Sequence, residues 1–403
     1  MKTEELPEFL NRYYQNIQSS NVIRQAEKPA ILLLGPQGLG KSTAVHDGAR
    51  LITNELKLEF INLKISHSSS GWRLQNGESS IPINEILENP DKYFVLVDLR
   101  LTAHEPTDIS GYPKEKDGIM FYEPFLWASI LSRSRGILFI DELTNETRPD
   151  KISVAYQLVL DKIAGFTAFS KGVLVVAAGN RPEHSASANL LPTPLINRFL
   201  LLDVTQPSLS AWYKYMEGNY SGMWDKRSYV FLMAFQSENY IMRIPTETES
   251  LEQYPTHRSW TMLSLSMHSG LRDEEVILGL IGKETGTKFK AFIDTRVDLD
   301  ELLSHPEKFK ELSLDSKYMT IMLLAAKISK IYSSGKKMKE KLKAPDSLFV
   351  EMSEESKEFP VLILKIMDPQ AQIKYTTHLG RVYPKTISEI NVAAHNVRLE
   401  LKK

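Results

Sequence analysis

The chain has 403 residues, and its 49 lysines and arginines nearly balance its 50 aspartates and glutamates. The net charge of −1 gives no general attraction to nucleic acid or to an anionic membrane, and the length allows about two or three hydrophobic cores. The absence of cysteine excludes disulfides, zinc–cysteine sites and thiol nucleophiles. The apolar runs are too short for a transmembrane helix, and the start MKTEELPEFL lacks a signal-peptide pattern, so we expect a cytoplasmic protein without a membrane segment.

Strand and helix patterns alternate over the first half of the chain, which predicts a parallel sheet with helices on both faces. The expected strands are residues 30–34, 58–65, 93–98, 136–140, 172–178 and 199–204. The expected helices are residues 41–53, 123–132, 149–160 and 194–198. Together these elements predict an α/β core that ends near residue 206.

The strand 30–34 runs directly into the pattern G-x-x-x-x-G-K-S, which is typical of a loop that binds nucleotide phosphates. Its glycines let backbone N–H groups turn toward the phosphates, and the helix that follows adds its partial positive charge. Lys41 would offer its charge to the terminal phosphates, and Ser42 its hydroxyl to Mg²⁺. A chance glycine-rich turn is the alternative, which the flanking strand and helix disfavour. The predicted phosphate-binding residues are Gly35, Pro36, Gln37, Gly38, Leu39, Gly40, Lys41, Ser42 and Thr43.

Two acids end the apolar strand 136–140. If this strand lies near the one that carries the phosphate loop, Asp141 would reach the Mg²⁺ shell, often through water. Glu142 would then lie beside the terminal phosphate, where a carboxylate can orient and deprotonate the attacking water. The alternative is that Asp141 caps the following segment and Glu142 is a surface acid.

Polar side chains also stand next to the last two expected strands. Asn180 follows strand 172–178, and its amide could hydrogen-bond the attacking water or the terminal phosphate, or could simply form a turn. Arg198 precedes strand 199–204 and is available to a terminal phosphate bound by a neighbouring subunit. Arg198 could instead pair within its own subunit, and Arg181 competes with it for the role in trans.

From about Pro207 onward, helical periodicity replaces the strand pattern. We predict a helical region over 207–290, a less distinct boundary near 285–290, and a second helical region over 291–403. The expected helices are residues 225–235, 259–268, 274–281 and 316–331.

Two basic features lie in this helical half. Arg258 stands just inside a helix start, where it could contact phosphates of its own subunit or be an ordinary surface arginine on a capped helix. Lysines crowd residues 327–343, which is conceivable as a nucleic-acid patch. Because Tyr332 is the single aromatic residue among these lysines, base stacking has little support, and a solvated helix end and loop, broken at Ser333-Ser334-Gly335, explains them better.

These motifs, in this order, resemble the AAA+ ATPases, and most of all their MoxR-like branch. The resemblance identifies the phosphate loop as the Walker A motif, Asp141 and Glu142 as Walker B, Asn180 as sensor 1, Arg198 as the arginine finger and Arg258 as sensor 2. It implies a P-loop NTPase sheet followed by a helical lid, ATP and Mg²⁺ as cofactors, and a homo-oligomeric ring, expected to be a hexamer. Further similar stretches are residues 98–113, 155–161, 178–181 and 255–260.

The separation between Lys41 and Asp141 exceeds what one β-α-β step needs, so we expect inserted structure around 67–122. The MoxR-like resemblance implies a β-hairpin within the second helix near residues 106–113. Tyr112 and its neighbours would then face the pore or upper surface of the ring and contact a client. A rigid turn built by the small and polar residues of this stretch is the alternative.

The sequence therefore predicts a Mg²⁺-dependent ring ATPase that remodels or activates a protein partner. The resemblance implies that this partner is often a von Willebrand A-domain protein. One alternative is a nucleic-acid motor (helicase, loader or restriction-type NTPase), which the near-neutral charge disfavours. The other is a scaffold that binds nucleotide without hydrolysing it. One departure from the family pattern is Thr144-Asn145, which replaces an aliphatic–Asn pair and leaves Asn145 as a candidate helper near the nucleotide.

Overall fold

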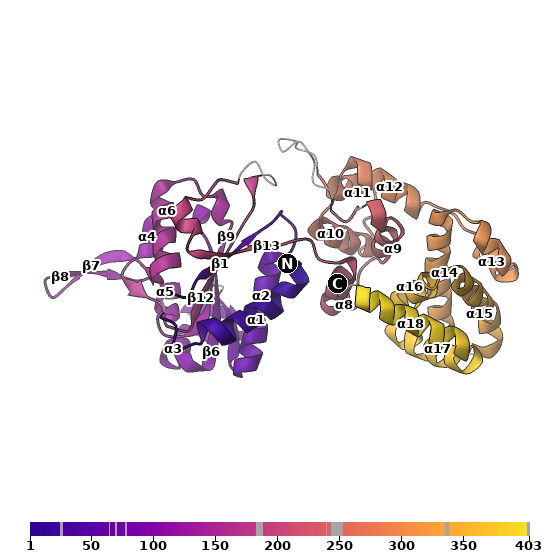
Figure 1. Ribbon diagram of the computed structural model, residues 1–403, viewed down its shortest axis with the longest axis horizontal. Helices are drawn as coiled ribbons and strands as arrows, with labels where there is room; N and C mark the ends of the chain where they lie inside the picture. Colours follow the sequence, from indigo (N-terminus) through magenta and orange to yellow (C-terminus); the bar gives the residue numbers. More distant parts are fainter. Residues whose placement is uncertain are drawn as a thin grey trace. The chain divides into compact units, whose positions relative to one another are not determined.

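A computed structural model describes residues 1–24, 27–63, 65–68, 71–76, 79–182, 188–238, 240–242, 253–334 and 338–400. Within 65–68, 71–76, 79–82, 333–334, 338–339 and 393–400 it describes the backbone alone. The chain forms two compact units, one from Met1 to Pro207 and one that begins at Ser208, and each has its own hydrophobic core (Figure 1). None of the helices described is long and apolar enough to cross a membrane.

The first unit is built on a parallel sheet that has six strands within the described residues, in the order β13-β1-β12-β9-β6-β2. The strands are β1 (Ala30–Leu34), β2 (Glu59–Asn62), β6 (Tyr93–Arg100), β9 (Arg135–Asp141), β12 (Val173–Gly179) and β13 (Phe199–Asp203). The central strand β12 is buried along its whole length, as expected of a sheet covered on both faces. The predicted fold class, a P-loop NTPase sheet followed by helices, is confirmed.

Helices flank this sheet, and four of them lie near the predicted positions, whereas the helix before residue 41 and the two between residues 83 and 110 were not predicted. The flanking helices are α1 (Leu6–Tyr13), α2 (Lys41–Leu56), α3 (Ile83–Glu88), α4 (Pro106–Ser110), α5 (Leu126–Leu131), α6 (Pro149–Tyr156) and α7 (Thr193–Ile196). The face of α2 that carries Val45, Ala49 and Ile52 is buried, at the i, i+4, i+7 spacing of an amphipathic helix. Gly48 lets α1 pack closely on α2, because a Cβ there would lie 2.9 Å from Leu10 Cδ1.

Three expected elements of the first unit are each four residues shorter than predicted. The strand expected over 58–65 ends at Asn62, and Ile65 already begins another strand. The helix expected over 123–132 begins only at Leu126, because Glu123 belongs to a strand and Pro124 follows it. The helix expected over 149–160 leaves α-geometry after Tyr156 and continues as a π-helical turn.

Small β structures extend from the sheet. They are the antiparallel set β3 (Ile65–Ser68), β4 (Gly71–Asn76) and β5 (Ser79–Pro82), the hairpin β7 (Tyr112–Lys116) and β8 (Ile119–Glu123), and the short hairpin β10 (Ile163–Ala164) and β11 (Thr167–Ala168). The hairpin β7–β8 projects from the body of the first unit (Figure 1). Its turn residues Asp117 and Gly118 both have positive φ, 56° and 77°, as a tight two-residue hairpin turn requires.

The second unit is helical throughout its described residues. Its helices are α8 (Leu209–Tyr220), α9 (Arg227–Ala234), α10 (His257–His268), α11 (Glu274–Ile281), α12 (Lys283–Ile293), α13 (Leu299–Ser304), α14 (Leu314–Ser334), α15 (Met338–Glu355), α16 (Glu358–Ile366), α17 (Pro369–Val382) and α18 (Pro384–Glu400). One core runs from Leu209 to Ile390, so the regions 207–290 and 291–403 share it, and α12 passes through residues 285–290.

The lysine-rich stretch 327–343 is only partly described. Lys327 pairs with Asp300, with 2.7 Å between Nζ and Oδ1, which fits a solvated helix surface better than a free basic patch. Gly335, Lys336 and Lys337 lie outside the described residues.

Candidate functional site

The phosphate loop, the two acids and the asparagine meet at the carboxyl edge of the sheet. They follow β1, β9 and β12, and β12 lies between the other two. β1 itself lies between β12 and β13. After β1 the chain crosses to β2 at the far edge and returns through β6 and β9 to β12, and it then passes β1 to add β13, so the connections after β1 and β12 run in opposite directions. Open α/β sheets bind ligands in the crevice at such a switch point. The structure therefore brings together residues that are far apart in sequence.

Glycine is required at three places in the phosphate loop. Gly38 and Gly40 have positive φ, 76° and 84°, a backbone conformation that other residues rarely adopt. At Gly35, a Cβ would lie 2.4 Å from the carbonyl oxygen of Val204, in the segment that follows β13. The loop is thus shaped by close backbone approach and leads straight into the N-terminus of α2, which favours an anion.

Lys41 connects the loop to the neighbouring strand. Its Nζ donates hydrogen bonds to the carbonyl oxygens of Gly35 and Pro36, at 2.5 and 2.8 Å, and to Asn180 Oδ1 at 3.3 Å. The ammonium group is therefore folded back on the loop, and the amide of Asn180 lies within its reach. A bound terminal phosphate would replace the loop carbonyls as the partner of the Lys41 ammonium group, within reach of the Asn180 amide.

Asp141 and Ser42 form the predicted Mg²⁺ pair. Ser42 Oγ donates to Asp141 Oδ2 at 3.0 Å, and the Asp141 side chain is largely buried. A hydroxyl and one carboxylate are hard oxygen ligands, and Mg²⁺ commonly takes one or two carboxylates beside phosphate oxygens and water. The donor set therefore fits this ion. Among the residues that the structure describes, no cluster of three or more metal-binding side chains occurs.

Arg100 also belongs to this site, although the sequence assigned it no role there. It ends β6 as the register partner of Asp141, and its Nη2 lies 3.7 Å from Asp141 Oδ2. The same carboxylate oxygen is therefore shared by a hydroxyl and a guanidinium. Only knowledge of the strand order, with β6 beside β9, would have predicted this neighbour.

Glu142 adopts an unusual backbone conformation. Its φ is +57°, in the left-handed region that costs a residue other than glycine about 1–2 kcal/mol. Its backbone N–H donates to Asp141 Oδ1 at 3.0 Å, and Asn145 Nδ2 approaches its Oε2 at 3.5 Å. Asn145 Oδ1 is buried without a hydrogen-bond partner in the described part of the chain. Asn145 therefore contacts the predicted catalytic acid, where the helper role would place it.

Asn180 is buried at the tip of β12 and is held by a residue that follows the two acids. Its backbone N–H donates to Thr144 Oγ1 at 2.8 Å. The sequence singled out Thr144 only as a departure from a family pattern, and the structure places it between the acids and the amide.

The three predicted arginines have different environments. Arg181 pairs with Asp203, at the carboxyl end of β13, through an Nε–Oδ1 hydrogen bond of 2.9 Å. Arg198 is exposed after α7, and its side chain makes no ion pair or hydrogen bond within the described residues. Arg258 is exposed on the first turn of α10, behind the cap formed by Thr256 and Ser259, and belongs to the second unit. Its contact with a nucleotide stays a prediction.

No family model and no curated protein matches the chain. Solved structures match it loosely. PCH-2 of C. elegans is 15% identical, with 72% of this chain and 67% of that chain covered and a TM-score of 0.32. The Aeropyrum pernix ORC1 protein in complex with DNA is 12% identical (83% and 72% covered, TM-score 0.37), and the FIGL-1 AAA domain in complex with ADP is 13% identical (70% and 78%, 0.31). Likeness this loose does not define an activity. Strand order and the loop–helix arrangement define the P-loop NTPase fold.

Proposed function

We propose that this chain is a Mg²⁺-dependent ATPase of the AAA+ class. The observation that carries the proposal is the pair of contacts Ser42 Oγ–Asp141 Oδ2 and Lys41 Nζ–Asn180 Oδ1, at 3.0 and 3.3 Å. They join the phosphate loop, which follows β1, to the carboxyl ends of β12 and β9. Mg²⁺, held through Ser42 and Asp141, would neutralise charge on the β- and γ-phosphates when it is bound.

The chain's own residues then divide the work. Lys41 exchanges the loop carbonyls for the terminal phosphates, and the backbone N–H groups of the loop bind the remaining oxygens. Glu142 orients the attacking water and accepts its proton at the side-chain carboxylate, while Asn145 restricts where that carboxylate points. Asn180 hydrogen-bonds the water or the γ-phosphate. Positioning and electrostatics of this kind account for most of the catalysis of phosphoryl transfer.

We further propose that the active assembly is a ring, of six copies by resemblance to the MoxR-like branch. Arg198 supports this proposal because it is exposed and has no partner within the described residues, so it is available to a nucleotide on a neighbouring copy. Arg181 is less available, since it is paired with Asp203. Arg258 would report the nucleotide state to the helices of the second unit.

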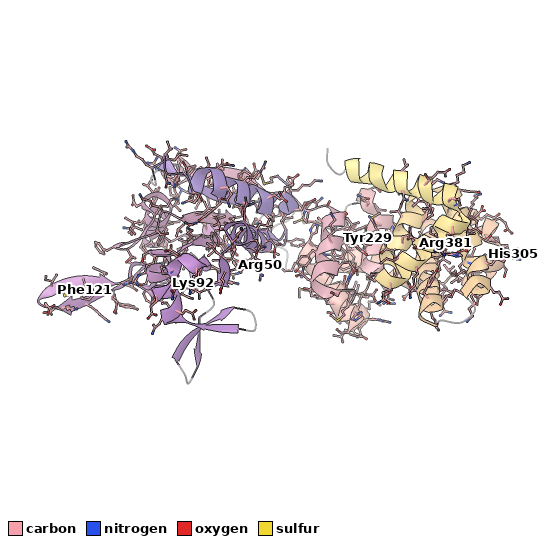
Figure 2. All side chains as sticks on the ribbon, turned by 90° about the horizontal axis from the view of Figure 1, so that it is seen from below. Arg50, Lys92, Phe121, Tyr229, His305 and Arg381 are labelled. Carbon is pink, nitrogen blue, oxygen red and sulfur yellow. The ribbon has the colours of Figure 1, made fainter. Side chains whose placement is uncertain are left out.

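The partner that this ring acts on is proposed to be a protein, for which the MoxR-like resemblance suggests a von Willebrand A-domain protein. The hairpin β7–β8 supports a protein client, because its strands are exposed throughout and carry an unusual density of apolar side chains. Figure 2 shows Phe121 on this projecting hairpin. The exposed apolar residues here are Tyr112, Ile119, Met120, Phe121 and Tyr122, together with Phe166 in the turn between β10 and β11.

Glu142→Gln tests the ATPase proposal. We expect the variant to bind ATP with near-normal affinity and to lose about 10²-fold or more of its turnover, because the attacking water loses its base. The control is Glu88→Gln, which removes an exposed carboxylate at the end of α3 and should leave turnover unchanged. A wild-type protein that binds ATP but hydrolyses it no faster than Glu142→Gln is a nucleotide-bound scaffold. Turnover that DNA stimulates with steep salt dependence would identify a nucleic-acid motor.

A further inference from the structure

Thr144 joins three segments of the candidate site. It lies in the 3-10 turn Leu143–Asn145, directly after the two acids, and its side chain is buried. Its hydroxyl oxygen accepts the backbone N–H of Asn180 at 2.8 Å, and its carbonyl oxygen accepts the backbone N–H of Asn189 at 2.7 Å. One residue thus ties the turn after Glu142 to the tip of β12 and to a later segment.

Close packing fixes the direction of the Thr144 hydroxyl. A Cβ on Gly179 would lie 2.5 Å from Thr144 Cγ2 and 2.7 Å from its Oγ1, so Thr144 fits only because residue 179 is glycine. A β-branched side chain has few accessible rotamers, and this contact restricts them further. The hydroxyl is therefore held toward the backbone of Asn180, the residue that follows Gly179.

The amide of Asn180 depends on this anchor. Its Oδ1 lies 3.3 Å from Nζ of Lys41, the residue to which the proposed function assigns the terminal phosphates. We infer that Thr144 is a positioning residue that sets the orientation of Asn180 and thereby the preference of the site for nucleoside triphosphate over diphosphate. This inference rests on the proposed function, because it concerns the same nucleotide site.

The experiment compares two substitutions that differ in one group. Thr144→Val keeps the shape of the side chain and removes the hydroxyl, whereas Thr144→Ser keeps the hydroxyl and removes the methyl group. Each is made in the full chain and in the Asn180→Ala background. The affinities for a non-hydrolysable ATP analogue and for ADP are measured by fluorescence titration with Mg²⁺, and turnover is measured in parallel.

We expect Thr144→Val to lower both the triphosphate preference and kcat by about tenfold, since it leaves the buried N–H of Asn180 without its acceptor. Thr144→Ser should stay within about threefold of the wild type, and in the Asn180→Ala background Thr144→Val should add almost no loss, because two residues that act as one unit are not additive. Thermal unfolding of each variant reports whether it folds.

Two results would overturn the inference. One is an equal loss of affinity for both nucleotides in Thr144→Val, and the other is a loss that persists in full when Asn180 is already alanine. Either would reduce Thr144 to a packing residue. A wild-type protein that binds both nucleotides without hydrolysing ATP would refute the ATPase proposal alone, because the affinity cycle still decides the role of Thr144. A wild-type protein that binds neither nucleotide refutes both.

Discussion

Arg100 places a positive charge beside Asp141, the carboxylate that would bind Mg²⁺. The guanidinium lies 3.7 Å from Asp141 Oδ2, the oxygen that also accepts the Ser42 hydroxyl. Arg100 and the metal ion would therefore compete for one acid. The side chain of Arg100 is 53% exposed, so solvent weakens the pair, and its worth is on the scale of other exposed ion pairs, about 1 kcal/mol at most.

Arg100→Gln should accordingly lower the Mg²⁺ concentration needed for half-maximal nucleotide binding by up to about fivefold. A Mg²⁺ titration with a fluorescent ATP analogue measures this shift. Arg135→Gln is the matched control, because it removes an exposed arginine at the opposite end of β9. If both variants respond to Mg²⁺ as the wild type does, Arg100 does not compete for Asp141.

Lys162 is a second charged residue with an unusual environment. It follows the π-helical turn Gln157–Asp161, has a φ of +56°, and donates from Nζ to the carbonyl oxygen of Val159 at 2.6 Å. Burial of the side chain lowers the pKa of Lys162 from 10.5 to about 8. Between pH 8 and 10.5 the unfolded chain therefore binds more protons at this residue than the folded chain, and Lys162 makes stability rise with pH.

The free energy of unfolding should rise between pH 7.5 and 9.5 by about 2 kcal/mol more in the wild type than in Lys162→Met, which has no proton to lose. Urea unfolding at the two pH values measures the difference. Lys57→Met is the control, since Lys57 also has a φ of +56° at a helix end but is exposed. A Lys162→Met profile parallel to that of the wild type would show that Lys162 titrates normally.

At the scale of elements, the hairpins β7–β8 and β10–β11 of the first unit contact each other. The rings of Tyr122 in β8 and Phe166 in the β10–β11 turn lie 4.9 Å apart. Beside Phe166, Gly165 touches the end of α4, where a Cβ would lie 2.1 Å from the carbonyl oxygen of Ser110. The short hairpin thus docks on the helix from which the long hairpin emerges.

Gly165→Ala should destabilise the first unit by about 2 kcal/mol more than Gly118→Ala, because the added methyl group collides with backbone. Both glycines have positive φ, 59° and 77°, so the conformational cost is matched, but Gly118 has open space around it. Chemical unfolding of the two variants measures the difference. Equal costs would mean that the turn moves away from α4 at little expense.

Local patterns carried most of what the sequence predicted at this scale. The loop 35–42 and the acids after β9 are contiguous in sequence, and runs of buried apolar residues mark the strands before them. Arg100 could not be found in this way, because its role depends on β6 lying beside β9. Thr144 could not be found either, because its position depends on the absence of a Cβ at Gly179. The π-helical end of α6 has no known signal in the residue types.

At the scale of the whole molecule, the chain contains two separately packed cores, and the candidate site described lies entirely in the first unit. Arg198, at the carboxyl end of α7, is the predicted link to another copy. Assembly is thus predicted to complete the site with a charge that one chain does not supply to itself.

Arg198→Ala should leave nucleotide affinity nearly intact and reduce turnover by about 10³-fold, as expected when an arginine supplied in trans is lost. Mixing Arg198→Ala with Glu142→Gln subunits should restore part of the activity, because some junctions then combine an intact acid with an intact arginine. Arg181→Ala, which breaks the pair with Asp203, serves as the comparison. Mixed rings that form but recover no turnover would refute the assignment in trans.

The hairpin β7–β8 is held mainly by its own ladder, and every residue of its two strands faces solvent. Substitution within 112–123 therefore costs the sheet and its neighbours little. Descendants of this gene can therefore change that stretch, and with it the apolar surface that the hairpin exposes, without altering the sheet that carries the phosphate loop.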